Sequence, residues 1–179
     1  LILGQAHYGL SDYAQAQSCY QRCLTLVEPS GEQKSRSTQN RRRALSALAG
    51  LGHICRSQGR YQEAQDLYAQ QLQGAQNLAD QEAEGAAWGN LGTIAHSTGC
   101  YSEAVDCHQR YLEVCTTQEQ RRGQCAALDN LGLAYRALGQ MVEALDCHRR
   151  SLAIAQAIES PYDEAGAWGN LGLVQLSQG

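Results

Sequence analysis

Small and apolar residues recur along the chain at a spacing of forty residues. Four leucines are in register without a gap, and a glycine follows each of them: Leu51, Leu91, Leu131 and Leu171. A fixed period of this size is the sequence signature of a solenoid, in which supersecondary units stack on one another. The hydrophobic pattern therefore predicts a repeat protein that lacks a single central core.

Each period contains two apolar stripes with helical spacing. The first stripe follows the steps i, i+3, i+4 and i+7 of one helix face: Trp88, Leu91, Gly92 and Ala95. The second stripe continues in steps of four: Ala104, His108 and Leu112. Gly99 stands between the stripes, and glycine accepts the left-handed conformation that ends helices. Each period therefore predicts a helix, a tight turn and a second helix, with Gly92 allowing close approach of the two.

The same register predicts seven complete helices after the first repeat. They are expected over residues 39–58, 61–78, 81–98, 101–117, 121–138, 141–158 and 161–178. Asp80 precedes the third of these helices and is expected to cap it. Ser160 is expected to cap the last helix, with Pro161 at its first position.

We expect one continuous array over residues 1–179. It divides into a truncated repeat (1–27), a basic loop insertion (28–40), three repeats (41–80, 81–120 and 121–160) and a half repeat (161–179). The insertion and the start of the next helix are rich in basic residues: Lys34, Arg36, Arg41, Arg42 and Arg43. A solvated loop and an accessory contact for an acidic partner both remain open for this stretch. Because the chain stops half a repeat in, we expect a fragment of a longer array.

The repeated residues resemble the tetratricopeptide repeat family. Its pattern is Trp-x2-Leu-Gly-x2-Tyr, followed by Ala-x3-aromatic, and the matching residues are Trp88, Leu91, Gly92, Ala104 and His108, then Leu128, Leu131, Gly132, Tyr135, Ala144 and His148. Repeats of forty residues resemble Pins-type G-protein-signalling modulators and related long-repeat scaffolds. The resemblance implies an all-α, right-handed superhelical solenoid of antiparallel helix pairs, with a concave groove that binds extended or helical segments of a partner.

Composition and charge narrow the function classes. The net charge of −4 and the pI of about 5.7 argue against nucleic-acid binding. No stretch has the length of apolar residues that a membrane span needs, and the first residues do not form a signal peptide. We therefore expect a cytoplasmic protein without direct membrane insertion.

The eight cysteines are expected to be reduced. Cys19, Cys107 and Cys147 share a repeat position with Leu67, which marks this position as apolar. Such cysteines behave as small buried hydrophobic residues. Cys100 is the exception, since Asp12, Arg60 and Gln140 occupy its position in other repeats.

Two Cys-His pairs, Cys107-His108 and Cys147-His148, invite a metal-site interpretation. Neighbouring residues on a helix point about 100° apart, so neither pair can readily chelate one ion. Tyr20 and Tyr68 occupy the histidine positions in other repeats, which favours an aromatic packing role. We expect no metal, no cofactor, no catalytic residue and no enzymatic activity.

The resemblance implies that the first helix of each repeat lines the concave groove, and the residues that vary between repeats on its solvent-facing stripe are the candidate binding residues. They are His53, Arg56, Thr93, His96, Asp129, Leu133, Arg136, Leu173 and Leu176. Arg56, His96 and Arg136 share one position in three successive first helices, so we expect a protein or peptide partner that is acidic or amphipathic. The alternatives are self-association through exposed terminal repeats, or a regulatory domain of a larger protein whose activity lies elsewhere.

Overall fold

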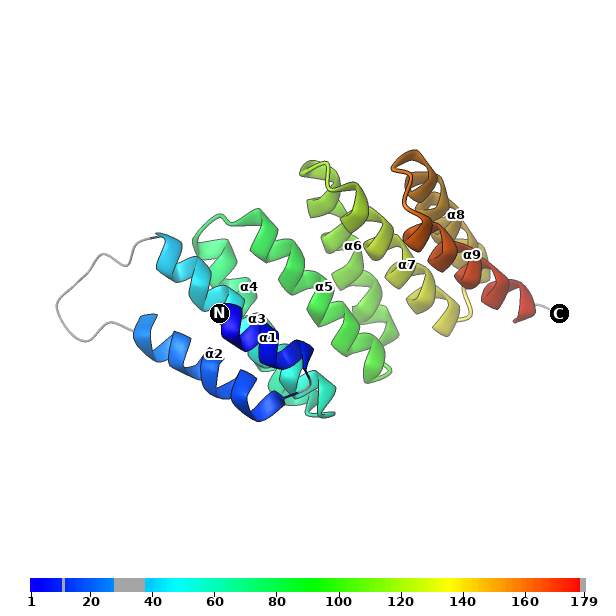
Figure 1. The fold of residues 1–179 in the computed structure, drawn as a ribbon. Helices are drawn as coiled ribbons and strands as arrows, with labels where there is room; N and C mark the ends of the chain where they lie inside the picture. Colours follow the sequence, from blue (N-terminus) through cyan, green and yellow to red (C-terminus); the bar gives the residue numbers. More distant parts are fainter. Residues whose placement is uncertain (11, 28–37, 178–179) are drawn as a thin grey trace. The chain divides into compact units, whose positions relative to one another are not determined.

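The computed structural model describes residues 1–10, 12–27 and 38–177, and this part of the chain is all-α (Figure 1). Its helices are α1 (Ile2–Gly9), α2 (Tyr13–Val27), α3 (Thr38–Ser57), α4 (Tyr61–Asn77), α5 (Gln81–Ser97), α6 (Tyr101–Thr117), α7 (Arg121–Ala137), α8 (Met141–Ala157) and α9 (Pro161–Leu176). The ends predicted for the helices of 61–158 agree with these bounds within one residue. Helix α3 begins at Thr38, so the end of the expected loop is helical, and residues 28–37 lie outside the described part.

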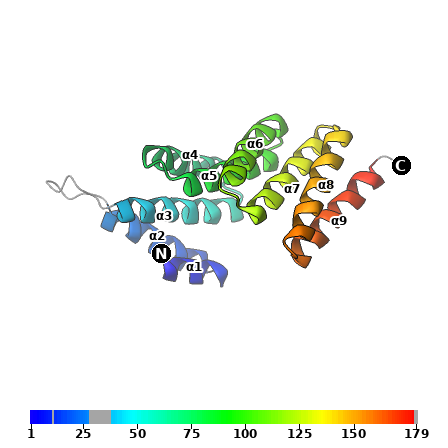
Figure 2. The ribbon, with the colours of Figure 1, turned by 90° about the horizontal axis from the view of Figure 1, so that it is seen from above.

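The chain forms two compact units, Leu1–Ala87 and Trp88–Gly179. In unit 1, α1 packs on α2, α2 on α3, and α3 on α4. In unit 2, α6 packs on α7, and α7, α8 and α9 lie side by side (Figure 2). Helix α5 contributes its first two turns to unit 1 and the remainder to unit 2. The predicted all-α architecture of antiparallel helix pairs is confirmed.

Glycines end the first helix of each complete pair, as predicted. Gly59, Gly99 and Gly139 have φ angles of 73°, 81° and 77°, in the left-handed region that favours glycine. After Gly99, the N–H of Cys100 donates to the carbonyl of Ala95 at 2.8 Å, which closes the helix end. The turn residue therefore sets where the chain reverses.

A ring from each second helix packs onto a glycine of its first helix. A Cβ atom on Gly92 would lie 2.6 Å from His108, and a Cβ on Gly52 or Gly132 would collide in the same way with Tyr68 or His148. The two histidines are 1% and 0% exposed, so their predicted packing role is confirmed. Apolar residues from neighbouring helices complete the core of unit 2, among them Ala95, Ala104, Leu128, Leu131 and Ala134.

One of the two predicted caps is confirmed and the other is wrong. The N–H of Ala83 donates to Oδ1 of Asp80 at 3.2 Å, as expected of an N-cap. Ser160 makes no such bond: its hydroxyl instead donates to Oδ2 of Asp163 at 2.6 Å. Ser160 does occupy the N-cap position, but its hydroxyl is turned toward the Asp163 carboxylate and its oxygen accepts no backbone N–H; Pro161 stands at the helix start as predicted.

None of the helices in the described part of the chain has the length and apolar character that crossing a membrane requires.

The cysteines are free, and most are buried as predicted. Burial raises the pKa of Cys107 and of Cys147 to about 11. Cys19 is only half-buried, because it lines a surface hollow with Leu3, Cys23 and Arg43, so its grouping with the buried thiols is wrong. Cys100 is exposed, as its polar counterparts in other repeats indicate.

Brief alkylation of the native protein is expected to label Cys100 first. Its thiol is exposed, whereas Cys107 and Cys147 are shielded and carry little reactive thiolate. Peptide mass spectrometry after increasing exposure to iodoacetamide gives the order of labelling. Labelling of Cys147 ahead of Cys100 in the folded protein would contradict this assignment.

Candidate functional site

A stripe of α3 opens onto a cavity of about 520 Å³ in unit 1. The stripe carries Arg42, Ser46, Ala49 and His53, which fall on one helix face at spacings of three and four. Two of these four side chains are small, so the surface of α3 is recessed between Arg42 and His53. We call this cavity the α3 pocket.

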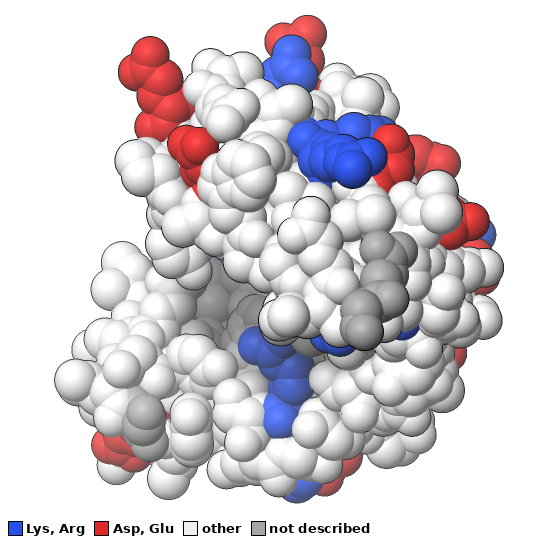
Figure 3. All heavy atoms as spheres, turned by 90° about the vertical axis from the view of Figure 1, so that its right-hand side faces the viewer, with Lys and Arg blue, Asp and Glu red and all other residues white. Residues whose placement is uncertain are grey.

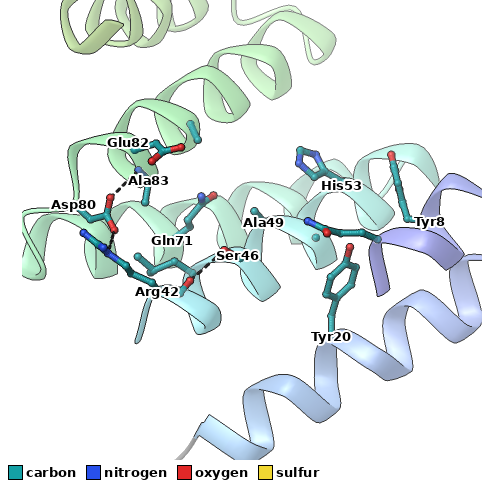
Figure 4. A pocket seen from close by; sticks show the side chains of 14 residues that line it. Tyr8, Tyr20, Arg42, Ser46, Ala49, His53, Gln71, Asp80, Glu82 and Ala83 are labelled. Carbon is teal, nitrogen blue, oxygen red and sulfur yellow. Dashed lines mark hydrogen bonds and ion pairs between the residues drawn. The ribbon is translucent and has the colours of Figure 1, made fainter. Parts of the chain in front are cut away.

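Four other helices, with Asp80 at the start of α5, complete the α3 pocket. Tyr8 comes from α1, Tyr20 from α2 and Gln71 from α4, while Glu82 and its neighbours come from the first turns of α5. Figure 4 shows Gln71 between the α5 end of the pocket and the end at which the aromatic rings gather. The pocket is therefore built from side chains far apart in the sequence.

The end near α5 is held by an ion pair. Nε of Arg42 lies 2.7 Å from Oδ2 of Asp80, whose side chain is only 11% exposed (Figure 4). Since Oδ1 of Asp80 accepts the N–H of Ala83, both carboxylate oxygens have partners. Glu82 is exposed beside this pair and takes part in no ion pair within the described residues.

The opposite end is aromatic and uncharged at neutral pH. Burial, together with the nearby charge of Arg56, lowers the pKa of His53. Nδ1 of His53 lies 2.9 Å from the hydroxyl oxygen of Tyr68, and its ring is 6.2 Å from that of Tyr8. The pKa of Tyr20 is raised by burial. This end therefore offers ring surfaces and neutral polar groups.

Gln71 is a buried polar residue of the pocket. It is 3% exposed, and its Oε1 has no hydrogen-bond partner within the described residues. A buried acceptor without a donor is costly and is uncommon in native structures.

In unit 2, the predicted residues of α5 and α9 differ in exposure. Thr93 is half-buried, and its hydroxyl donates to the carbonyl of Gly89 at 2.9 Å. The ring of His96 packs on that of Tyr101, with centroids 5.3 Å apart. Leu173 and Leu176 on α9 are 47% and 80% exposed. Only the two leucines therefore present open apolar surface.

The predicted residues of α7 differ in their chemical surroundings. Oδ1 of Asp129 lies 3.2 Å from Nδ1 of the buried His148, so this carboxylate supports the packing ring. Arg136 is half-buried, forms no ion pair within the described residues, and has a buried Nε without a partner. Leu133 between them is half-buried.

His53 and Arg56 belong to unit 1, whereas the other seven predicted residues belong to unit 2. His53 lines the α3 pocket and Arg56 does not. The shared row of Arg56, His96 and Arg136 spans both units and stays a prediction. Figure 3 shows a face on which most side chains are uncharged, with acidic and basic groups intermixed.

Sequence reasoning misses most of the α3 pocket. The candidate residues come from the second half of each first helix, while Arg42 and Glu82 stand in the first turns of α3 and α5 at one repeat position. That position holds Arg122 and Tyr162 in later repeats, so its variation is a usable signal. Gln71 lies on a second helix, where Tyr111 and Ser151 are its counterparts.

In the described part of the chain, three or more His, Cys, Asp or Glu side chains do not gather in a group suited to a metal ion. The arrangement can offer surfaces, hydrogen bonds and charges to a partner.

The family model for the tetratricopeptide repeat matches residues 43–117 and 123–179, and a second model with the same description matches residues 1–26. A search of curated proteins found no match.

Several solved structures share the fold. BtubC (BKLC) from P. vanneervenii has a TM-score of 0.82 at 20% identity, over 97% of this chain and 69% of that one. RapI in its apo form has a TM-score of 0.79 at 12% identity, over 88% of this chain and 54% of RapI. A putative kinesin light chain from Podosopora anserina, with nearly identical TPR-like repeats, has a TM-score of 0.76 at 16% identity, over 98% and 83% of the two chains. At these identities the likeness concerns the fold alone.

Proposed function

The chain belongs to the tetratricopeptide repeat family, and we propose that it holds segments of partner proteins against the first helices of its helix pairs. Stacked helical repeats supply extended binding surfaces, and this fold is that of a protein-interaction scaffold. The proposed function is non-enzymatic.

The α3 pocket is the observation that carries this proposal. Ser46 and Ala49 have small side chains, so an extended backbone can lie close to this part of α3. Gln5 and Tyr8 on one side and the first turns of α5 on the other supply hydrogen-bonding groups and walls. A cavity of about 520 Å³ has room for a few side chains of a partner, and such mostly preformed hollows are where ligands bind.

In unit 2 we propose a second contact surface made by Arg136, Leu133, Leu173 and Leu176. The cation has no ion pair within the described residues, and Leu176 is 80% exposed. This combination suits a partner segment with acidic and apolar side chains. An exposed charge pair contributes only ~0.2–1 kcal/mol, so the leucines supply the larger share of the affinity.

Selection of peptides on the whole chain tests both surfaces. Peptides from a random display library are selected, and their affinities are measured by calorimetry for the native chain and for Ala49→Trp. An indole at Ala49 fills the α3 pocket, so peptides that bind there are expected to lose at least about tenfold in affinity. Peptides that keep their affinity for Ala49→Trp are expected to bind Arg136→Glu more weakly. The glutamate repels acidic side chains of the peptide, and the attraction of the arginine is lost.

Ala69→Trp is the matched control. Ala69 is exposed on α4, a second helix, and lies outside the α3 pocket. Tryptophan at this position adds the same ring to the surface without filling the pocket. Circular dichroism of each variant confirms that it retains its helices. If neither Ala49→Trp nor Arg136→Glu weakens any selected peptide while Ala69→Trp does, partners bind the second helices and the proposal fails.

A further inference from the structure

We propose that the α3 pocket receives a basic side chain of the partner, with a guanidinium as the preferred group. This inference rests on the proposed function, because it names the chemistry that the same pocket recognises. It departs from the acidic partner expected for Arg56, His96 and Arg136, none of which lines this pocket.

Two side chains of the pocket, Gln71 and Glu82, present acceptor oxygens to an entering group. Oε1 of Gln71 has no donor within the described residues although the residue is 3% exposed. The terminal torsion of a glutamine is broad, so its amide can turn to offer this oxygen to an entering donor. Glu82 adds a carboxylate that is exposed and takes part in no ion pair within the described residues. A donor-rich group would satisfy both residues.

The charge of the pocket has the sign that a cation requires. Its lining contains five ionisable side chains besides Glu82: Tyr8, Tyr20, Arg42, His53 and Asp80. Arg42 and Asp80 neutralise each other at 2.7 Å, and His53 is uncharged because burial lowers its pKa. The lining therefore carries the single negative charge of Glu82 near α5, while Arg56, whose charge acts on His53, lies outside the lining.

The surfaces of the pocket also match an arginine stem and head. Leu45, Ala49, Ala83 and Ala86 supply apolar contact for the methylenes, in the way that long basic side chains cover apolar surface. The half-buried ring of Tyr8 can attract a cation to its aromatic face, whereas Tyr20 is covered by Gly50. A planar guanidinium has five donors in a fixed fork, so one head group can donate to more than one acceptor, whereas an ammonium is a compact point charge.

Titration of the isotope-labelled chain with small probes tests this proposal. N-acetyl-arginine amide is added at 150 mM salt, and amide chemical shifts are followed by NMR. Saturable shifts are expected at residues of the α3 pocket. N-acetyl-citrulline amide, which has nearly the same shape without the charge, is expected to bind at least about fivefold more weakly, and N-acetyl-aspartate amide is expected to produce no saturable shifts there.

Two variants connect the probe to the named acceptors. Gln71→Leu removes the buried oxygen and is expected to lower the affinity for the arginine probe about tenfold or more. Glu82→Gln removes a surface charge and is expected to lower this affinity up to about fivefold. Glu103→Gln is the matched control, since it removes the same charge from an exposed site on α6 and is expected to leave the affinity unchanged.

The possible failures are distinguishable. Equal binding of arginine and citrulline probes, preferential binding of the aspartate probe, or an absence of saturable shifts in the pocket would each overturn the choice of a basic side chain. Those results leave the proposed function standing as long as Ala49→Trp weakens the selected peptides. Full affinity of the arginine probe in both Gln71→Leu and Glu82→Gln would also overturn the assignment, even if the probe bound nearby.

Discussion

Replacement of Gly92 with leucine is expected to lower the free energy of unfolding of unit 2 by ~1–3 kcal/mol or more, the usual cost of overpacking a core. A Cβ at this position would already lie 2.6 Å from Cε1 of His108, and the remaining leucine atoms would meet the same ring. His108 is 1% exposed, so it has no room to withdraw without moving α6. The loss should appear in urea unfolding followed by circular dichroism.

Gly172→Leu is the matched control for this prediction. Gly172 occupies the same repeat position on α9, but a Cβ placed there would meet nothing within 4 Å. Leucine is a better helix former than glycine, so this change is expected to be neutral or to stabilise by ~0.5–1 kcal/mol. A similar loss in both variants would show that the cost comes from the helix itself and not from the ring that packs on Gly92.

The helices could be predicted because their signals are local and repeated. Gly59, Gly99 and Gly139 each end a helix in the left-handed conformation, and one residue type in one register is enough to indicate these three ends. The contact of a ring with a glycine recurs likewise, which is why Tyr68, His108 and His148 could be assigned to packing. In a repeat, one correct interpretation is tested several times within one chain.

The candidate site could be predicted only in part, because position within a repeat does not say which groups already have partners. Asp129 stands on the expected binding face, yet its carboxylate is used by His148. Gln71 stands on a second helix, yet it reaches the α3 pocket with an acceptor that has no donor within the described residues. Both facts depend on side-chain packing between helices, which the forty-residue register does not encode.

His108 is expected to make unit 2 less stable as the pH falls from neutral toward 4. Burial, with a smaller contribution from the charge of His96, lowers the pKa of His108 from its ordinary 6.5 to about 4. Between these values the unfolded chain takes up a proton that the folded chain does not, so protonation favours unfolding. The contribution is absent above about pH 7.5, reaches about 2 kcal/mol at pH 5, and approaches about 3 kcal/mol near pH 4.

His108→Tyr isolates this effect from other titrating groups, which include His53 and the carboxylates. Tyr20 and Tyr68 occupy the same position in earlier repeats, and each packs on a glycine of its own repeat. The position therefore accepts a phenol ring, which stays neutral throughout this pH range. Urea unfolding at pH 7.5, 6 and 5 is expected to show a steeper loss of stability in the native chain than in the variant. The difference between the two slopes measures His108 alone, because every other titrating group is common to both proteins. Parallel slopes would mean that the folded chain protonates this imidazole as readily as the unfolded chain does, and that burial does not hold His108 neutral.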